Sequence, residues 1–326
     1  MRIHIQNPPP HSPLQITPVL WDAAALRAAE AGRGHTVTFS DTNSGFADAM
    51  KEAEALVGDK EVLRALLPCP APRLKIIYVC NAGLDNLAPF DWLPPGVALL
   101  NNRGTHAIKA GEFGLMSLLM LANRVPEMVT HQRAGRWHQL WGRVLRGRRV
   151  TVVGLGVLGG TTAEHAARLG ARVTGVRVTP APHPACEAVV GAEALDAVLP
   201  ETEYLVLACP LTPKTRYILN RRRIGLLPRG AGVVNIGRGP LVEQEALCDA
   251  LDAGALGGAV LDVFDPEPIP EGHRLWTTPN VIISPHTAAD DLDTYFPRSL
   301  DVFFENVRAF QERRPLPTRF DPERGY

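Results

Sequence analysis

Val150-Thr-Val-Val-Gly154-Leu-Gly156-Val-Leu-Gly159 joins an apolar run to three glycines in the spacing GxGxxG. A helix-favouring segment and the β-branched run Arg172–Val176 follow it. The motif alone is weak evidence, but between a strand, a helix and a second strand it predicts the phosphate-binding turn of a dinucleotide fold. Gly154 would allow the tight turn, Gly156 a close approach to a pyrophosphate, and Gly159 close packing of helix on strand.

Short apolar runs recur on both sides of this turn and predict strands of parallel sheets. Six lie in the second half, which matches the strand count of a doubly wound dinucleotide fold: Val150–Val153, Arg172–Val176, Tyr204–Ala208, Gly232–Asn235, Gly258–Leu261 and Val281–Ser284. Five more precede the turn: Arg2–Gln6, His35–Phe39, Glu54–Val57, Leu74–Cys80 and Val97–Leu100.

Length and composition indicate an ordinary globular chain. Its 326 residues predict two domains, and 34 Lys and Arg balance 34 Asp and Glu. Without a basic excess we expect no nucleic-acid or membrane partner. The five cysteines are widely spaced without a CxxC pair, so we expect no metal site. Free thiols and no apolar signal-peptide core favour a cytoplasmic location.

The end of the run Arg172–Val176 bears on the choice of cofactor. NAD sites usually place Asp or Glu about 20 residues after the turn, for the ribose hydroxyls. Here Arg177 stands at that position. Its guanidinium could bind a ribose 2′-phosphate through charge-assisted hydrogen bonds, although a solvated surface arginine is the alternative. We favour NADP(H), with NAD(H) as the second option.

Three ionisable residues follow successive predicted strands of the second half: Arg238, Glu267 and His286. Ligands of open α/β sheets bind beyond the carboxyl ends of the strands, so these side chains are placed to meet. Arginine can hold a carboxylate, and histidine can carry a proton in either direction. A set of salt bridges on the surface would give the same pattern, and these three residues alone do not decide between an active site and such a set.

The chain resembles the D-isomer-specific 2-hydroxyacid dehydrogenases, of the glyoxylate/hydroxypyruvate reductase kind. The motifs cover most of the chain beyond about residue 70 and are highly specific together. They are Val153–Gly160, Leu207–Arg216, Asn235–Val242 with Glu245-Ala-Leu247, and Leu261–Pro268 through His286, with weaker matches at Asn81–Asn86 and Asp321–Tyr326.

The resemblance implies a role for each matching residue. His286 becomes the general acid/base with Glu267 as its partner, and Arg238 binds the substrate carboxylate. Backbone amides of Ala82 and Gly83 bind the same carboxylate, and His286 also touches the substrate. Residues expected at the cofactor are Gly154, Gly156, Val157, Leu158, Gly159, Arg177, Cys209, Pro210, Thr215, Ile236, Gly237, Arg238, Asp262 (on the nicotinamide side) and His286.

The chain departs from the family in the cofactor turn. Val157 and Leu158 stand where the family usually has Arg-Ile, which removes one phosphate contact. The ribose-binding Asp is also absent. The set of Arg238, Glu267 and His286 is complete, so we expect activity.

The resemblance also implies an α/β fold of two doubly wound parallel-sheet domains. A Rossmann cofactor domain, 103–287, is inserted in a flavodoxin-like substrate domain made of 1–102 and 288–326. The helical segment Arg298–Glu312 then returns to the first domain. The apolar helix Ala107–Asn123 and the arm after it, which carries two tryptophans, are expected to form a homodimer interface.

We therefore expect hydride transfer between NADP(H) and a small 2-oxoacid or D-2-hydroxyacid such as glyoxylate or hydroxypyruvate. Two alternatives stay open: a nucleotide-sensing corepressor-like binding protein, and a dehydrogenase of the phosphite or formate type. The set of Arg238, Glu267 and His286 does not separate the first alternative, because the corepressors resemble the enzymes there. The lack of a long disordered tail argues against it.

Overall fold

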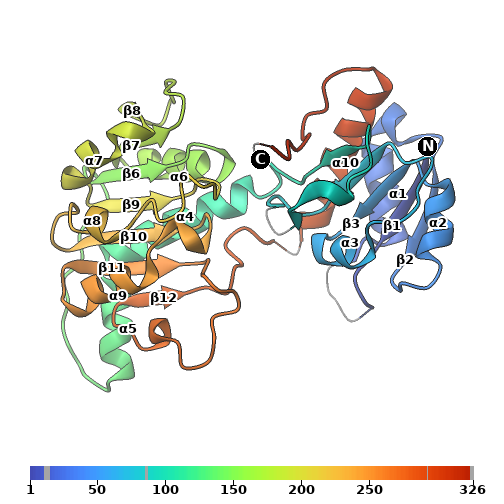
Figure 1. Cartoon of the computed structure of the whole chain (residues 1–326). Coiled ribbons are helices and arrows are strands. Elements are labelled where there is room, and N and C mark those ends of the chain that lie inside the picture. The colour runs from blue at the N-terminus through green and yellow to red at the C-terminus, as the bar shows by residue number, and fades with distance from the viewer. Residues whose placement is uncertain (11–14, 85–86, 292, 324–326) are drawn as a thin grey trace. The chain divides into compact units, whose positions relative to one another are not determined.

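The chain folds into two compact units in a computed structural model that describes residues 1–323 apart from 11–14, 85–86 and 292. Unit 1 is made of residues 1–105 and 291–326, and unit 2 of residues 106–290 (Figure 1). Unit 2 is therefore inserted in unit 1, with one chain crossing after Thr105 and a second before Asp291.

Unit 1 is built on a five-stranded sheet in the order β2-β1-β3-β4-β5, with all pairs parallel. This is the flavodoxin-like strand order, so the predicted fold of this unit is confirmed. The strands are β1 (Arg2–Gln6), β2 (Thr36–Ser40), β3 (Ala55–Gly58), β4 (Ile76–Val79) and β5 (Ala98–Leu100).

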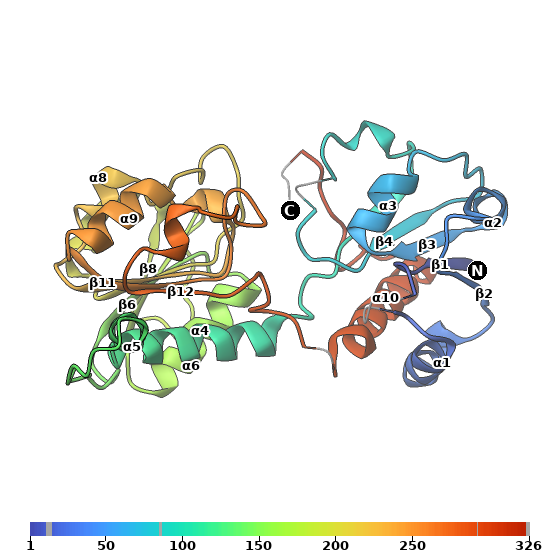
Figure 2. The same ribbon diagram turned by 90° about the horizontal axis from the view of Figure 1, so that it is seen from below.

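Helices cover both faces of this sheet (Figure 2). On one face α1 (Pro18–Arg27) and α10 (Tyr295–Gln311) pack together, and on the other lie α2 (Phe46–Glu52) and α3 (Lys60–Leu66). Alternation along β4 explains the two layers, because Tyr78 faces the α10 cluster while its neighbours face the α2 and α3 cluster. The predicted C-terminal helix thus belongs to unit 1.

Unit 2 is built on a parallel seven-stranded sheet in the order β12-β11-β10-β9-β6-β7-β8. Reading from β6 outward, this is the doubly wound dinucleotide-binding order extended by one strand, as predicted for a Rossmann domain. The strands are β6 (Arg149–Val153), β7 (Arg172–Arg177), β8 (Ala188–Gly191), β9 (Tyr204–Leu207), β10 (Ala231–Asn235), β11 (Leu256–Leu261) and β12 (Val281–Ile283).

The prediction of six strands in this half is wrong by one, because β8 was missed. β8 lies at the edge of the sheet and pairs only with β7 in the described structure. Three of its four residues are at least partly exposed. An edge strand with little burial lacks the continuous apolar run by which buried parallel strands are found.

Helices also cover both faces of the unit 2 sheet (Figure 2). One face carries α4 (Ala107–Ala122), α5 (Val125–Arg133) and α6 (Val157–Arg168), and the other carries α8 (Arg221–Ile224) and α9 (Gln244–Asp252); α7 spans Leu195–Val198. Helices α4 and α6 lie against each other closely, since a Cβ on Gly114 would come within 2.2 Å of Thr162 Oγ1.

Helix α4 keeps one apolar face that the rest of unit 2 covers only in part: Met116 is 40% exposed, and its neighbours on this face are half-buried. Leu115, Met116, Leu119 and Met120 line a shallow groove of about 430 Å³ there. Within residues 1–323, less the gaps named above, no helix has the length and apolar character needed to cross a membrane.

Candidate active site

The glycine-rich turn has the backbone shape that its sequence predicts. Gly154 has φ +96°, and a Cβ there would come 2.7 Å from the backbone nitrogen of Cys209. A Cβ on Gly159 would come 1.9 Å from the carbonyl oxygen of Gly154. At Gly156, the residue that caps α6, a Cβ would meet nothing within 4 Å. The turn is thus closed where helix and strand pack and open where the helix N-terminus could receive a phosphate.

The loops after β9 and β10 lie beside this turn. Cys209 follows β9 and touches Gly154, and a Cβ on Gly237, after β10, would come 2.9 Å from the Cys209 carbonyl. Thr215 stabilises its own loop, donating to the Pro210 carbonyl at 2.7 Å. The structure therefore brings together three of the strand ends at which cofactor residues were predicted, those of β6, β9 and β10.

Cys209 is buried, and its chemistry follows from that. Burial raises the pKa of the thiol to about 11. The thiol is therefore protonated near neutral pH and unsuited to act as a nucleophile. Its role beside the turn is that of a small packing residue.

Arg177 is the last residue of β7, the strand next to β6. It pairs through the backbone with Gly191 of β8. Within the described part of the chain, no hydrogen bond or ion pair engages its guanidinium. The structure places a basic side chain, half-buried and available to a ligand, where NAD sites usually place an acid.

His286 and Glu267 form a direct pair. The distance from His286 Nδ1 to Glu267 Oε2 is 2.8 Å, and the other Glu267 oxygen accepts from the Phe264 N–H at 2.7 Å. Burial alone would raise the pKa of Glu267, but these hydrogen bonds and the charges of His286 and Arg238 outweigh it and lower the pKa. The carboxylate therefore remains ionised beside the imidazole.

Asp262 holds the loop that carries His286. Its Oδ1 accepts from the amides of Thr287 at 2.9 Å and Ala288 at 3.0 Å, and its carbonyl accepts from the His286 N–H at 2.9 Å. His286 adopts φ +56°, a left-handed conformation that is unfavourable for a side chain with a Cβ. Such conformations persist where the surroundings over-determine them, often at active sites.

Burial raises the pKa of Asp262, against hydrogen bonds that would lower it. The carboxylate oxygens are engaged by backbone amides of the loop after β12, a use that the sequence did not predict. Its predicted contact with the nicotinamide stays a prediction. An aspartate directly after a strand was the available signal.

Arg238 lies at the end of the β10 loop, near the His286–Glu267 pair. Its Nη1 donates to the Gly237 carbonyl at 2.8 Å, and its charge helps to lower the pKa of Glu267. Asn235, a residue the sequence reading did not assign a role, shapes this loop: its amide donates to the Arg238 carbonyl at 2.9 Å. The three predicted ionisable residues therefore form one cluster within unit 2.

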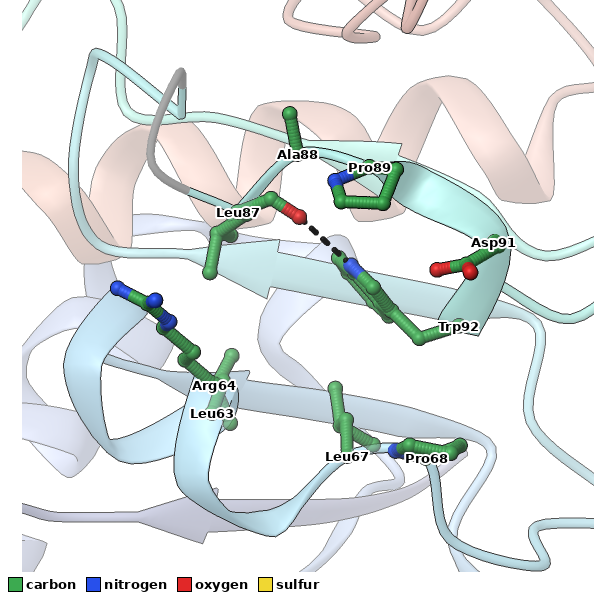
Figure 3. A pocket seen from close by; sticks show the side chains of 9 residues that line it. All are labelled: Leu63, Arg64, Leu67, Pro68, Leu87, Ala88, Pro89, Asp91 and Trp92. Atoms are coloured by element: carbon green, nitrogen blue, oxygen red, sulfur yellow. Dashed lines mark hydrogen bonds between the residues drawn. The ribbon is translucent and has the colours of Figure 1, made fainter.

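The predicted carboxylate loop, Ala82-Gly83, lies in unit 1 directly after β4. The Ala82 carbonyl accepts from the Asn101 side chain at 2.7 Å. The chain that follows this loop borders a cavity of about 240 Å³ between residues 87–92 and α3, in which the Trp92 indole donates to the Leu87 carbonyl at 2.9 Å (Figure 3). None of the predicted site residues lines this cavity.

Comparison with known proteins agrees with the geometry. Residues 115–288, more than half of the chain, match the NAD binding domain of D-isomer specific 2-hydroxyacid dehydrogenases. Glyoxylate reductase of Korarchaeum cryptofilum is 30% identical over 290 residues, covering 85% of each chain.

Solved structures resemble the whole chain. A D-isomer specific 2-hydroxyacid dehydrogenase from Xanthobacter autotrophicus Py2, in complex with NADPH and MES, has a TM-score of 0.82 at 32% identity and covers 100% of this chain and 99% of its own. The NADPH-dependent glyoxylate/hydroxypyruvate reductase of Sinorhizobium meliloti, in complex with NADP and sulfate, has a TM-score of 0.83 at 26% identity with the same coverage. The chain therefore belongs to the D-isomer specific 2-hydroxyacid dehydrogenase family, and it is an NAD(P)-dependent enzyme of that family.

Proposed function

We propose that this enzyme transfers a hydride between NADP(H) and a small 2-oxoacid, with glyoxylate and hydroxypyruvate as the leading substrates. The observation that carries the proposal is the 2.8 Å contact between His286 Nδ1 and Glu267 Oε2, with Arg238 close by. A proton carrier, an anion that stabilises its charged form and a carboxylate binder are the groups that reduction of a 2-oxoacid requires. The names of similar proteins support the substrate class.

His286 acts as the proton donor in reduction. Because its Nδ1 is engaged by Glu267, Nε2 is the atom left to give a proton to the carbonyl oxygen of the substrate. Glu267 stabilises the imidazolium before transfer and fixes the orientation of the ring. In the oxidative direction His286 takes the proton from the substrate hydroxyl.

Arg238 binds the substrate carboxylate. A guanidinium can donate two parallel hydrogen bonds to a carboxylate, which places the carbonyl carbon as well as binding the acid. Within unit 1, the backbone amides of Ala82 and Gly83 are the proposed donors to a carboxylate. Both contributions are lost with a carbonyl compound that has no carboxylate.

The residues of the turn fit a dinucleotide. The open side of Gly156 and the N-terminus of α6 would receive the pyrophosphate, and Arg177 would bind the ribose 2′-phosphate of NADP(H). When bound, the nicotinamide supplies or accepts the hydride. The NADPH and NADP complexes of the two similar structures support this preference.

The partly exposed apolar face of α4 supports a two-fold homodimer. The arm after α5 exposes Trp137 fully and Trp141 by 74%. Large exposed apolar side chains next to an apolar groove usually mark a protein interface. We propose that a second copy of the chain covers this region.

The cysteines support a reducing compartment. All five are free thiols, three of them buried. Unpaired thiols are typical of proteins kept in the cytoplasm. We therefore propose a cytoplasmic location.

The function is tested by following oxidation of NADPH and NADH with a panel of 2-oxoacids that includes glyoxylate, hydroxypyruvate and pyruvate. Phosphite and formate with NADP⁺ test the other reaction types. We expect the highest kcat/KM with NADPH and a small 2-oxoacid. Turnover of phosphite or formate alone, or no turnover while NADPH still binds, would contradict the proposal.

A further inference from the structure

Two asparagines that follow β5 hold the loop that follows β4. The strands β4 and β5 are parallel neighbours, so their carboxyl ends lie side by side. Asn101 and Asn102 come directly after β5, and Cys80–Gly83 come directly after β4. Both segments belong to unit 1, which makes their contacts internal to one compact unit.

Three consecutive carbonyls of the β4 loop accept hydrogen bonds from these two asparagines. The Cys80 carbonyl accepts from the Asn102 side chain at 3.1 Å, the Asn81 carbonyl from the Asn102 N–H at 3.0 Å, and the Ala82 carbonyl from the Asn101 side chain at 2.7 Å. Within the described residues, the N–H groups of Ala82 and Gly83 have no acceptor. The protein thus satisfies the carbonyls of residues 80–82, and the N–H groups of Ala82 and Gly83 are left for a ligand.

The asparagine pair is itself fixed by its surroundings. Asn102 is fully buried; its side chain also donates to Ser299 Oγ at 2.7 Å and accepts from the Tyr78 hydroxyl at 2.6 Å. The Tyr295 hydroxyl donates to the Cys80 carbonyl as well. Two of these partners lie on α10, far from the loop in sequence, so the loop is held by residues that no local motif could include.

Asn101 has a simpler set of contacts. It is 3% exposed, and its side-chain Oδ1 is buried without a protein partner among the described residues. The one described side-chain bond that it makes is the one to Ala82. The hydrogen bond from Asn101 Nδ2 to the Ala82 carbonyl is thus the contact through which this side chain can hold the loop.

We infer that Asn101 and Asn102 are positioning residues for the substrate carboxylate. By engaging the carbonyls of residues 80–82, they hold the Ala82 and Gly83 amides as a preformed donor pair for an anionic group. Preformed donors bind an anion without first being ordered, which favours affinity. The inference rests on the proposed function, in which these amides bind the carboxylate.

The test replaces Asn101 by Ala in the full chain and separates the kinetic constants. We expect the KM for glyoxylate and the inhibition constant of oxalate to rise roughly five- to tenfold, the effect of losing one hydrogen bond of ordinary strength. The KM for NADPH should stay within twofold of wild type, because Asn101 does not contact the turn. An unchanged KM for glyoxylate, or an equal rise for both substrates, would overturn the inference.

Thr202→Ala is the control. Thr202 is a buried polar residue, 1% exposed, and it lies in unit 2, away from Asn101 in unit 1. Its hydroxyl contacts Thr151 Oγ1 at 2.7 Å and donates to the Val198 carbonyl at 2.8 Å. We expect it to lower the melting temperature while leaving the KM for glyoxylate near wild type. A rise in that KM equal to the one in Asn101→Ala would show that loss of stability, and not loop position, sets the effect.

Hydrogen exchange on the unaltered protein gives a second readout that does not depend on the folding of a variant. With NADP⁺ present, oxalate should slow the exchange of the Ala82 and Gly83 amides. If oxalate protects these amides but the protein reduces no 2-oxoacid, the proposed reaction is wrong and the proposed carboxylate binding by the loop stands. If the protein turns over glyoxylate without this protection, the reaction stands and the binding role of the loop is wrong.

Discussion

The glycine-rich turn and the loop that carries His286 both follow strands of the unit 2 sheet, yet they are shaped in opposite ways. The turn depends on missing side chains: a Cβ on Gly159 would lie 1.9 Å from a carbonyl oxygen. The His286 loop depends on hydrogen bonds from other side chains: Asp262 accepts from two of its amides, and Glu267 pairs with its imidazole.

This difference separates binding from chemistry. The turn has no titratable side chain, so it can only receive a ligand through its backbone and helix N-terminus. The His286 loop has a titratable pair, so it can move a proton. Substitutions in one region should therefore leave the property of the other nearly intact, and the predictions below test that separation.

The largest effect is expected at His286. In His286→Ala the proton donor is lost, so kcat for 2-oxoacid reduction should fall by about 10² to 10⁴. The dissociation constant of NADPH, measured by fluorescence titration, should stay close to wild type because the turn is untouched. His273→Ala is the control, since the one hydrogen bond that its side chain makes within the described residues is accepted from the Leu275 N–H at 3.2 Å. A kcat within about fivefold of wild type would remove His286 from the reaction.

The next largest effect is expected from a substitution in the glycine-rich turn that leaves the His286–Glu267 pair unchanged. Gly159→Ala forces a methyl group into the Gly154 carbonyl, so the free energy of unfolding should fall by about 1–3 kcal/mol, and NADPH should bind more weakly. Gly160→Ala is the matched control: its methyl group would meet nothing nearer than His183 Nε2 at 3.5 Å. Alanine is also the better helix former, by up to about 1 kcal/mol. The midpoint of denaturant unfolding should therefore fall in Gly159→Ala and rise in Gly160→Ala. Equal destabilisation of the two variants would show that the close contact between residue 159 and the Gly154 carbonyl does not limit the turn.

A smaller effect concerns which dinucleotide the turn region accepts. In Arg177→Asp a carboxylate replaces the guanidinium that would face the 2′-phosphate, so the ratio of kcat/KM for NADPH to that for NADH should fall by about tenfold or more. Arg172→Asp is the control, because Arg172 lies at the other end of β7. An Arg177→Asp enzyme that keeps the wild-type ratio would leave the preference without a cause at this position.

Both sheets, the turn and the His286–Glu267 pair could be predicted from the sequence because each leaves a local mark. Buried parallel strands are apolar runs, and the turn has its glycine spacing. Glu267 and His286, 19 residues apart, were expected to meet because both follow strands, and they do. Edge strand β8 left no such run.

The supporting contacts could not be predicted in the same way. Asn101 reaches Ala82 across 19 residues and Asn102 reaches Ser299 across 197, and each is a single side-chain bond. A hydrogen bond of this kind depends on the final packing of two strand ends or of a helix on a sheet. An asparagine after a strand has many other uses, such as turns and caps, so its residue type alone does not reveal its partner.

The smallest effect sharpens the role of the pair itself. The pKa of Glu267 is lowered from its ordinary value of 4.5, so its carboxylate stays ionised at a pH where a free glutamate would already be partly protonated. Glu267 therefore does not titrate over a pH range of about 5 to 9, where histidine changes charge. In Glu267→Gln the shape and the acceptor for the Phe264 N–H are kept, but the negative charge beside the imidazole is lost.

A protonated imidazole is then less stabilised, so reduction, which needs that proton, should fail at a lower pH than in wild type. The alkaline limb of the pH–rate profile should therefore move to lower pH, and the shift should be modest because the two side chains are 46% and 34% exposed and water screens their attraction. Glu271→Gln, a neutralised exposed carboxylate four residues along the chain, should leave the limb in place. A limb that stays or moves upward in Glu267→Gln would mean that Glu267 orients the imidazole without stabilising its charge.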